Sequence, residues 1–161
     1  MIIIMGVSGC GKTTVGELLS KKTGVPYYDA DDFHPQSNID KMKHNLALTD
    51  EDRLPWLNTL ANNIKVWQEN EGAILACSAL KESYRKILAS HGGSILWVYL
   101  SGSYEVIKSR IENRKGHYMK SHLLQSQFDD LEIPEYGYNI GIENTPQEIV
   151  NIIISKLKQH E

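Results

Sequence analysis

Cysteine is scarce in this chain. Only two of its 161 residues are cysteines, Cys10 and Cys77, which is too few for a framework of disulfides. Both fall in segments whose pattern indicates a loop and a buried strand, which fits a reducing compartment. Cys10 stands beside Lys12 and the start of a predicted helix, and such positively charged surroundings make a thiol reactive. We therefore hypothesise that oxidants or alkylating reagents modify Cys10.

The sequence also lacks long apolar runs and an excess of positive charge. No run approaches the roughly 20 residues that span a bilayer, and no basic segment precedes the first apolar stretch, so we expect a cytoplasmic protein without a membrane segment. The 17 lysines and arginines are outnumbered by 20 aspartates and glutamates. A nucleic-acid-binding face needs clustered basic residues, so a small-molecule partner is expected instead. The six histidines do not have the spacing of zinc ligands.

Short β-rich runs alternate with helical stretches along the whole chain, without an internal repeat or a linker. This alternation predicts one α/β domain over residues 1–161, with a mostly parallel sheet. The predicted strands cover residues 2–6, 26–29, 73–78, 95–100 and 138–143. The predicted helices cover residues 12–23, 37–45, 50–69, 79–90, 104–114 and 146–159.

A phosphate-binding loop follows the first predicted strand. Residues 6–13 (GVSGCGKT) match the pattern G-x-x-x-x-G-K-[ST], in which backbone N–H groups surround a β-phosphate. Lys12 is expected to reach the β- and γ-phosphates and the Thr13 hydroxyl to hold Mg²⁺. The alternative is a glycine-rich turn without a ligand, but a strand before the loop and a helix after it favour ATP. The predicted nucleotide-binding residues here are Gly6, Val7, Ser8, Gly9, Cys10, Gly11, Lys12, Thr13 and Thr14.

Two aspartates come at the end of the second predicted strand. Asp29 and Asp31 are alternate residues of an extended segment, so both carboxylates can face one cleft at the carboxyl edge of the sheet. Phosphoryl transfer to an alcohol needs a base for the hydroxyl and acidic groups near Mg²⁺. We assign Asp31 to the base and Asp29 to the metal. The alternative is that these acids only cap the next helix.

Other polar residues occur where ligand contacts are expected. Arg53 follows a predicted helix start at Thr49, and a guanidinium can grip a carboxylate with two parallel hydrogen bonds. An intrahelical ion pair between Arg53 and Asp50 explains the same residue equally well. Ser78 and Lys81 follow the third predicted strand and bring a hydroxyl and an ammonium near the loop.

A polar segment over residues 115–136 interrupts the strand and helix pattern. Nucleotide kinases carry a mobile lid at this place, and an ordinary surface helix is the alternative. Arg110 and Arg114 precede it and lie four residues apart, on one helix face. One of the two can lie on an adenine ring while the other contacts the transferred phosphate. Ordinary solvated arginines are the competing interpretation.

Several ordered blocks of the chain resemble the gluconokinase family. The blocks are residues 29–35 (DADDFHP), 38–42, 48–57 (LTDEDRLPWL), 77–81 (CSALK), 84–85, 116–119 (GHYM) and 123–128 (LLQSQF). The resemblance extends from the first strand to about residue 132. An ordered set of blocks at matching spacing is far more specific than the phosphate loop alone.

The resemblance implies ATP-dependent phosphorylation of D-gluconate at its 6-hydroxyl. It also implies a three-layer P-loop kinase fold with strand order 2-3-1-4-5, related to shikimate and adenylate kinases, and a homodimer. By the same resemblance, Asp31 is the base, Arg53 binds the gluconate carboxylate, and His34, Ser78 and Lys81 line the sugar-acid site. Arg110 and Arg114 resemble the adenine-side and lid arginines. The alternatives are another small-molecule kinase, acting on shikimate or a nucleoside monophosphate, and a nucleotide-binding regulator without catalysis.

Overall fold

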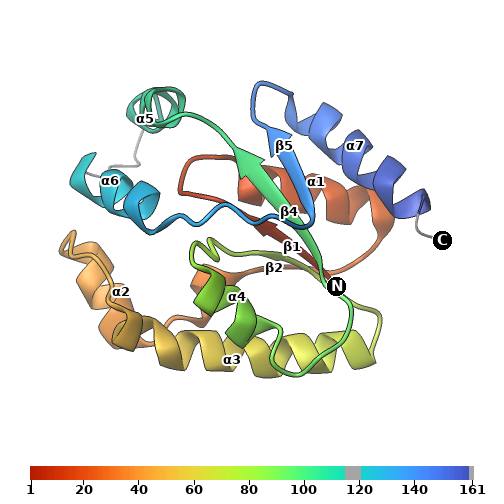
Figure 1. The fold of residues 1–161 in the computed structure, drawn as a ribbon, viewed down its shortest axis with the longest axis horizontal. Coiled ribbons are helices and arrows are strands. Elements are labelled where there is room, and N and C mark those ends of the chain that lie inside the picture. The colour runs from red at the N-terminus through yellow and green to blue at the C-terminus, as the bar shows by residue number, and fades with distance from the viewer. Residues whose placement is uncertain (115–120, 160–161) are drawn as a thin grey trace.

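Five parallel strands form one sheet in the order β2-β3-β1-β4-β5 (Figure 1), which confirms the predicted order. The computed structural model describes residues 1–114 and 121–159. In chain order the elements are β1 (Ile2–Met5), α1 (Lys12–Thr23), β2 (Tyr27–Asp29), the 3₁₀ helix η1 (Ala30–Phe33), α2 (Gln36–Lys43), α3 (Asp50–Glu69), β3 (Ile74–Ala76), α4 (Glu82–Leu88), β4 (Leu96–Ser101), α5 (Tyr104–Glu112), α6 (Ser121–Asp130), β5 (Tyr138–Gly141) and α7 (Pro146–Lys158).

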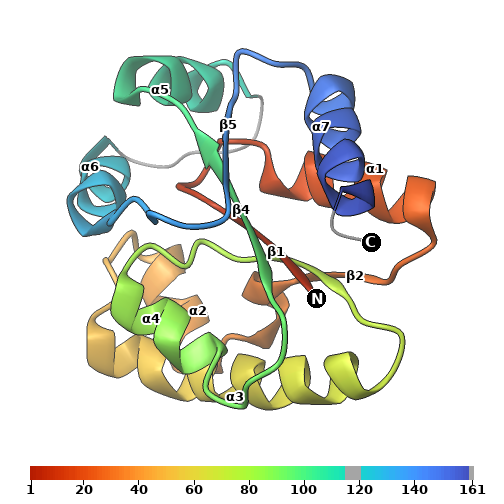
Figure 2. The same cartoon turned by 45° about the vertical axis from the view of Figure 1, so that its right-hand side comes forward.

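The sheet is buried on both faces because helices cover each of them. Strand β1 lies between β3 and β4, and its four residues are all buried. Ile2 and Ile4 pack in one core with α1, α5 and α7, whereas Ile3 and Met5 pack in a second core with α3 and α4. Figures 1 and 2 show the two helical layers on opposite sides of the sheet. The continuous apolar run of β1 follows from this burial on both faces.

The structure differs from the predicted boundaries mainly after β3. Helix α4 begins at Glu82 rather than at Ala79, because Ala79 has a positive φ of 44° that no helix accommodates. The buried Arg85 guanidinium donates from Nη1 to the carbonyls of Ala79 (2.7 Å) and Leu80 (3.1 Å), which holds this turn outside the helix. A non-local contact therefore sets the helix start.

The segment expected to be a lid contains helix α6 in the part that the structure describes. Residues 115–120 lie outside the described residues. They include residues 116–119, one of the blocks that resemble the gluconokinase family. Helix α6 contacts α5, and its Leu124 is buried in the same core as the α5 side chains. Within residues 1–114 and 121–159, no helix is both long and apolar enough to cross a bilayer.

Gly16 gives a test of the packing between α1 and β2. A Cβ at this buried position would lie 2.4 Å from Cε2 of Tyr27. Alanine normally favours a helix over glycine by about 1 kcal/mol, but overpacking costs about 1–3 kcal/mol. We expect Gly16→Ala to lower the free energy of unfolding by about 1 kcal/mol, measured from the urea midpoint at unchanged slope.

The matched background for this test is Tyr27→Leu, which removes the ring that the new methyl group would meet. In that background Gly16→Ala should stabilise the protein, because only the helix propensity remains. An equal loss of stability in both backgrounds would contradict the proposed overlap.

Candidate active site

A cavity of about 400 Å³ opens at the carboxyl edge of the sheet, where β1, β2 and β3 end. Residues of α6 and of the segment between α2 and α3 complete its wall. Most of the predicted site residues line this cavity: Ser8, Gly9, Gly11, Lys12, Thr13, Thr14, Asp29, Asp31, His34, Arg53, Ser78 and Arg114. The fold thus brings together residues from the phosphate loop, two further strand ends and helix α3.

The backbone conformation of the phosphate loop depends on its glycines and on hydrogen bonds from Lys12. Gly9 has a φ of 81° and Gly11 a φ of 100°, both in the region where side chains are strained. A Cβ on Gly9 would also lie 2.7 Å from Cγ1 of Ile111. The Lys12 ammonium donates to the carbonyls of Gly6 (2.9 Å) and Val7 (3.0 Å). The loop therefore places a positive charge and the start of α1 at one side of the cavity.

Cys10 lies beneath this loop rather than on its surface. Its side chain is buried, and its Sγ lies 3.9 Å from the Lys12 ammonium. Cys77 is also buried, and burial raises the pKa of the Cys77 thiol to about 12. The reactivity hypothesised for Cys10 stays a prediction.

The two aspartates occupy the same wall of the cavity. Asp29 Oδ1 accepts a hydrogen bond of 2.9 Å from the backbone N–H of Asp31, so Asp29 does cap η1. Both side chains nevertheless line the cavity, which capping alone does not require. Although the Asp31 side chain is 79% exposed, reduced hydration beside the cavity raises its pKa, the Asp29 carboxylate raises it further, and Lys12 opposes both. A raised pKa suits a carboxylate that must accept a proton.

This raised pKa predicts how the activity depends on pH. If Asp31 is the base that the sequence predicts, it accepts a proton only when it is ionised, so the rate falls as the pH drops through its pKa. Because kcat/KM reports the pKa values of the free enzyme, we expect the acidic limb of kcat/KM for the acceptor to have its midpoint above about 3.9, the ordinary aspartate value. The measurement is kcat/KM for the acceptor against pH at saturating ATP. An acidic limb that persists unchanged in the Asp31→Asn variant would contradict the assignment to Asp31.

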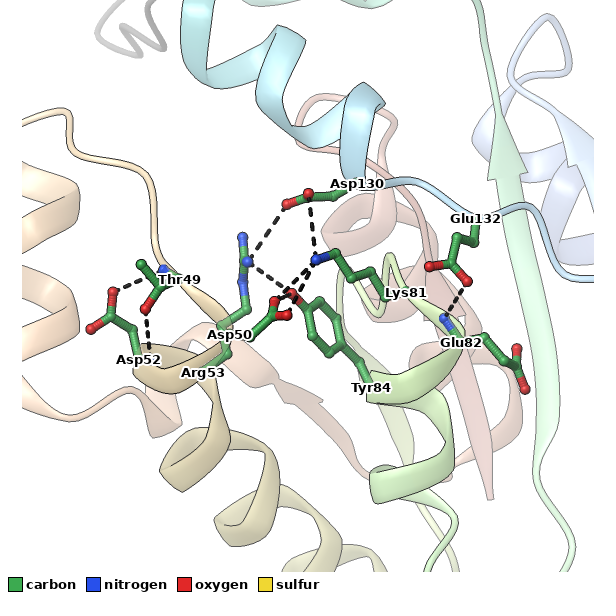
Figure 3. Close-up of polar contacts among 9 residues, drawn as sticks. All are labelled: Thr49, Asp50, Asp52, Arg53, Lys81, Glu82, Tyr84, Asp130 and Glu132. Carbon is green, nitrogen blue, oxygen red and sulfur yellow. Dashed lines mark hydrogen bonds and ion pairs between the residues drawn. The ribbon is translucent and has the colours of Figure 1, made fainter.

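Arg53 and Lys81 meet a carboxylate from helix α6. Arg53 Nη1 lies 3.6 Å from Asp130 Oδ2, and Lys81 Nζ lies 3.8 Å from Asp130 Oδ1 (Figure 3). Lys81 also donates to Asp50 Oδ1 at 3.1 Å. Arg53 donates to the hydroxyl of Tyr84 at 2.9 Å, and that hydroxyl donates to Asp50. Arg53 lines the cavity, whereas Lys81 is not among the described residues that line it.

The alternative interpretation paired Arg53 with Asp50, but the structure gives each of them another ion-pair partner. Asp50 pairs with Lys81, and hydrogen bonds from Tyr84 and Lys81 lower the pKa of Asp50. Arg53 instead faces Asp130, which is 77 residues away along the chain (130 minus 53). Neither Asp130 nor Tyr84 was predicted, because no local pattern connects residues so distant in sequence.

Helix α6 also contacts the phosphate loop directly. The backbone N–H of Ser8 donates to Gln127 Oε1 at 2.7 Å, and Gln127 Nε2 donates to Ser8 Oγ at 3.0 Å. At the other end of α6, His122 Nε2 lies 3.2 Å from the carbonyl of Asn45. Gln127 is another site residue that sequence reasoning missed, since its partner, Ser8, is 119 positions away.

A second cavity, of about 570 Å³, is also bordered by the phosphate loop. It is lined by residues of the loop, of α5 and of the turn after β5, including Arg110 and Asn144. Arg110 Nη2 donates to the carbonyl of Ile142 at 2.7 Å, which fixes the guanidinium at the cavity wall. Arg114 lines both cavities. Gly9, Gly11 and Thr14 also line both cavities, so the two spaces adjoin at the phosphate loop.

Known proteins resemble this chain over nearly its whole length. A protein-family model described as "AAA domain" matches residues 2–134. The probable gluconokinase of Mus musculus is 40% identical, and the alignment covers 98% of this chain and 97% of that protein. The crystal structure of a gluconokinase from Sinorhizobium meliloti 1021 is 38% identical with a TM-score of 0.89, covering 98% of this chain and 91% of that one.

A more distant structure agrees on the fold alone. The crystal structure of shikimate kinase from Aquifex aeolicus vf5 has a TM-score of 0.55 at 20% identity, covering 99% of this chain and 96% of that one. The predicted relation to the shikimate kinase fold is thus confirmed. The identity, the coverage and the five-stranded parallel sheet agree with the sequence blocks. By this agreement the chain belongs to the gluconokinase family of P-loop kinases.

Proposed function

We propose that this protein transfers the γ-phosphoryl group of ATP to the 6-hydroxyl of D-gluconate, giving 6-phosphogluconate and ADP. One observation supports this more than any other. A single cavity beside the phosphate loop is lined both by Asp31, which suits a base, and by Arg53, which suits a carboxylate. A sugar acid has a hydroxyl at one end and a carboxylate at the other, and so needs both groups.

On the donor side, the nucleoside occupies the second cavity and the phosphates lie along the loop. Lys12 moves from its carbonyl partners to the phosphates, and Arg110 contacts the adenine. Arg114, which lines both cavities, stabilises the charge on the transferred group. Thr13 and Asp29 would hold Mg²⁺, because a hydroxyl and a carboxylate that line the same wall match the oxygen ligands of this ion. When bound, Mg²⁺ supplies charge neutralisation at the phosphates.

On the acceptor side, Asp31 orients and deprotonates the 6-hydroxyl, and Arg53 binds the carboxylate. His34 and Ser78 line the sugar-acid chain between them. Lys81 contacts Asp130, which Arg53 also contacts, and so adds positive charge near the bound carboxylate. Helix α6, in the described part of the segment expected to be a lid, contacts the loop through Gln127. Closure of this lid excludes water from the phosphoryl group.

We further propose that the protein is a cytoplasmic homodimer. Both of its cysteines are free and buried, which supports a reducing compartment. The homodimer rests on the resemblance to the family. Sedimentation of the purified protein measures its mass directly, and a monomer at assay concentration would contradict the dimer.

The function is tested by a panel of acceptors with ADP release as the readout. We expect rapid ADP release with D-gluconate and little with shikimate, AMP or water. The product of the gluconate reaction should carry phosphate on C6, which ¹³C–³¹P coupling in the NMR spectrum identifies. Preference for AMP or shikimate would favour another kinase. The absence of ADP release with every sugar acid would favour a non-catalytic nucleotide-binding protein.

A further inference from the structure

Asn38 is a buried polar residue whose hydrogen bonds reveal the protonation of a histidine. Its side chain is only 1% exposed, in helix α2 next to the cavity wall. Asn38 Nδ2 lies 2.9 Å from the carbonyl oxygen of Asp52 and 3.1 Å from His34 Nδ1. A carbonyl oxygen can only accept, so the amide atom that faces it must be the NH₂ nitrogen. The same nitrogen faces His34 Nδ1, which therefore accepts a hydrogen bond and carries no proton.

The proton of the neutral His34 ring must then be on Nε2. The ring cannot easily turn, because its side chain is 4% exposed and it stacks on Trp56 with centroids 4.2 Å apart and planes 14° apart. Burial lowers the pKa of His34 to about 4, the Arg53 charge contributes to the lowering, and Asp29 opposes it. At neutral pH the ring is uncharged, and its Nε2–H lies 3.7 Å from Asp31 Oδ1.

From this geometry we propose that Asn38 is a positioning residue that keeps His34 in the neutral Nε2–H form, so that His34 offers a hydrogen-bond donor to the acceptor hydroxyl beside Asp31. The proposal rests on the function proposed above. With the proton on Nδ1 instead, His34 would present a lone pair next to the Asp31 carboxylate. Two acceptors would then face one hydroxyl, which has a single proton to donate. Asn38 thus determines whether His34 presents a hydrogen-bond donor or an acceptor to the substrate beside Asp31.

The tautomer is measured directly by ¹⁵N NMR on protein labelled at histidine. The two ring nitrogens differ in shift according to which one carries the proton, and the His34 signals are those that disappear in His34→Gln. We expect an unprotonated Nδ1 and a protonated Nε2 in the unaltered protein at neutral pH. A protonated Nδ1 would overturn the proposal. This readout needs no substrate, so it succeeds or fails independently of the proposed kinase activity.

The variant Asn38→Asp replaces the donor to Nδ1 with an acceptor of the same size. Its carboxylate favours a proton on Nδ1, so we expect the His34 signals to show the reversed or doubly protonated ring. The kcat for gluconate should fall about 10- to 100-fold, as for residues that orient a functional histidine, while the KM for ATP stays within about twofold. Unchanged His34 signals in folded Asn38→Asp would show that Asn38 does not set the tautomer.

The matched control is Asn62→Asp, at an exposed Asn–His pair elsewhere on the molecule. Asn62 Oδ1 lies 3.0 Å from His91 Nε2, and neither residue is among those that line the cavities. This substitution should leave kcat and both KM values unchanged.

Two further variants test the donor itself. His34→Gln places an N–H near the position of Nε2, and His34→Asn places one near Nδ1. We expect the glutamine variant to keep at least about tenfold more kcat, and the reverse order would overturn the proposal.

Discussion

Asp31→Asn is expected to lower kcat for gluconate by about 10²- to 10⁴-fold, the range for loss of a general base. The asparagine amide keeps the size of the side chain but cannot accept the hydroxyl proton. ATP binding should stay unchanged or become slightly tighter, because the substitution removes a negative charge from the wall that Lys12 also lines. Steady-state kinetics with saturating gluconate and calorimetric titration with MgATP measure the two effects separately.

The adjacent Asp32 supplies the control for this prediction. It is an exposed aspartate in the same 3₁₀ helix and is not among the residues that line the cavity. Asp32→Asn changes the net charge by the same amount, one residue away. We expect it to keep kcat within about twofold. Near-normal turnover in Asp31→Asn, or an equal loss in both variants, would mean that Asp31 is not the base.

Arg53→Met is expected to raise the KM for gluconate by about 10- to 100-fold, which corresponds to losing charge-assisted hydrogen bonds of about 1.5–3 kcal/mol. Methionine keeps the apolar stem of the arginine but removes its guanidinium. The side chain also forms a cation–π contact with Tyr84, at 5.3 Å from the ring centroid, and an ion pair with Asp130. Thermal unfolding of the variant must therefore accompany the kinetics, to separate lost binding from lost stability. The KM for ATP should change little.

The carboxylate itself can be removed to test the same contact. D-Glucitol has an alcohol in place of the gluconate carboxylate and keeps the hydroxyl at the other end. We expect the unaltered protein to phosphorylate it slowly at high enzyme concentration. Arg53→Met should then reduce kcat/KM for gluconate far more than kcat/KM for D-glucitol. A similar reduction for both acceptors would assign Arg53 to the structure of the cavity rather than to carboxylate binding.

Much of the fold and the donor side of the site could be predicted because the relevant signals are local. The apolar run at residues 2–5, the loop at residues 6–13 and the following helix are consecutive in sequence. Asp29 and Asp31 were predicted from strand alternation, but only Asp29 belongs to β2 and Asp31 lies in η1. Both line the cavity because β2 ends at the carboxyl edge of the sheet. Thr49 was expected at a helix start, and its hydroxyl does accept from the N–H of Asp52 at 3.1 Å in a capping box.

The acceptor side was predicted less completely because its contacts join distant parts of the chain. Asn38 comes within reach of His34 and of the Asp52 carbonyl only when α2 packs against the start of α3. Gln127 and Asp130 belong to the segment expected to be a lid, yet their partners are Ser8, Arg53 and Lys81. A single sequence carries no periodicity that would connect such residues.

The sequence by itself thus determined the fold class, the strand order through its family resemblance, and the phosphate-loop and aspartate residues that line the cavity. The reason is that strand alternation, helix capping and the phosphate loop depend on neighbours within a few positions. Only the tertiary structure decided that Lys81 shares Asp130 with Arg53 rather than lining the cavity, and that Asn38 Nδ2 faces His34 Nδ1. Both depend on which atoms the packed helices α2, α3 and α6 bring within a hydrogen-bond length, and that distance is set by packing rather than by order along the chain.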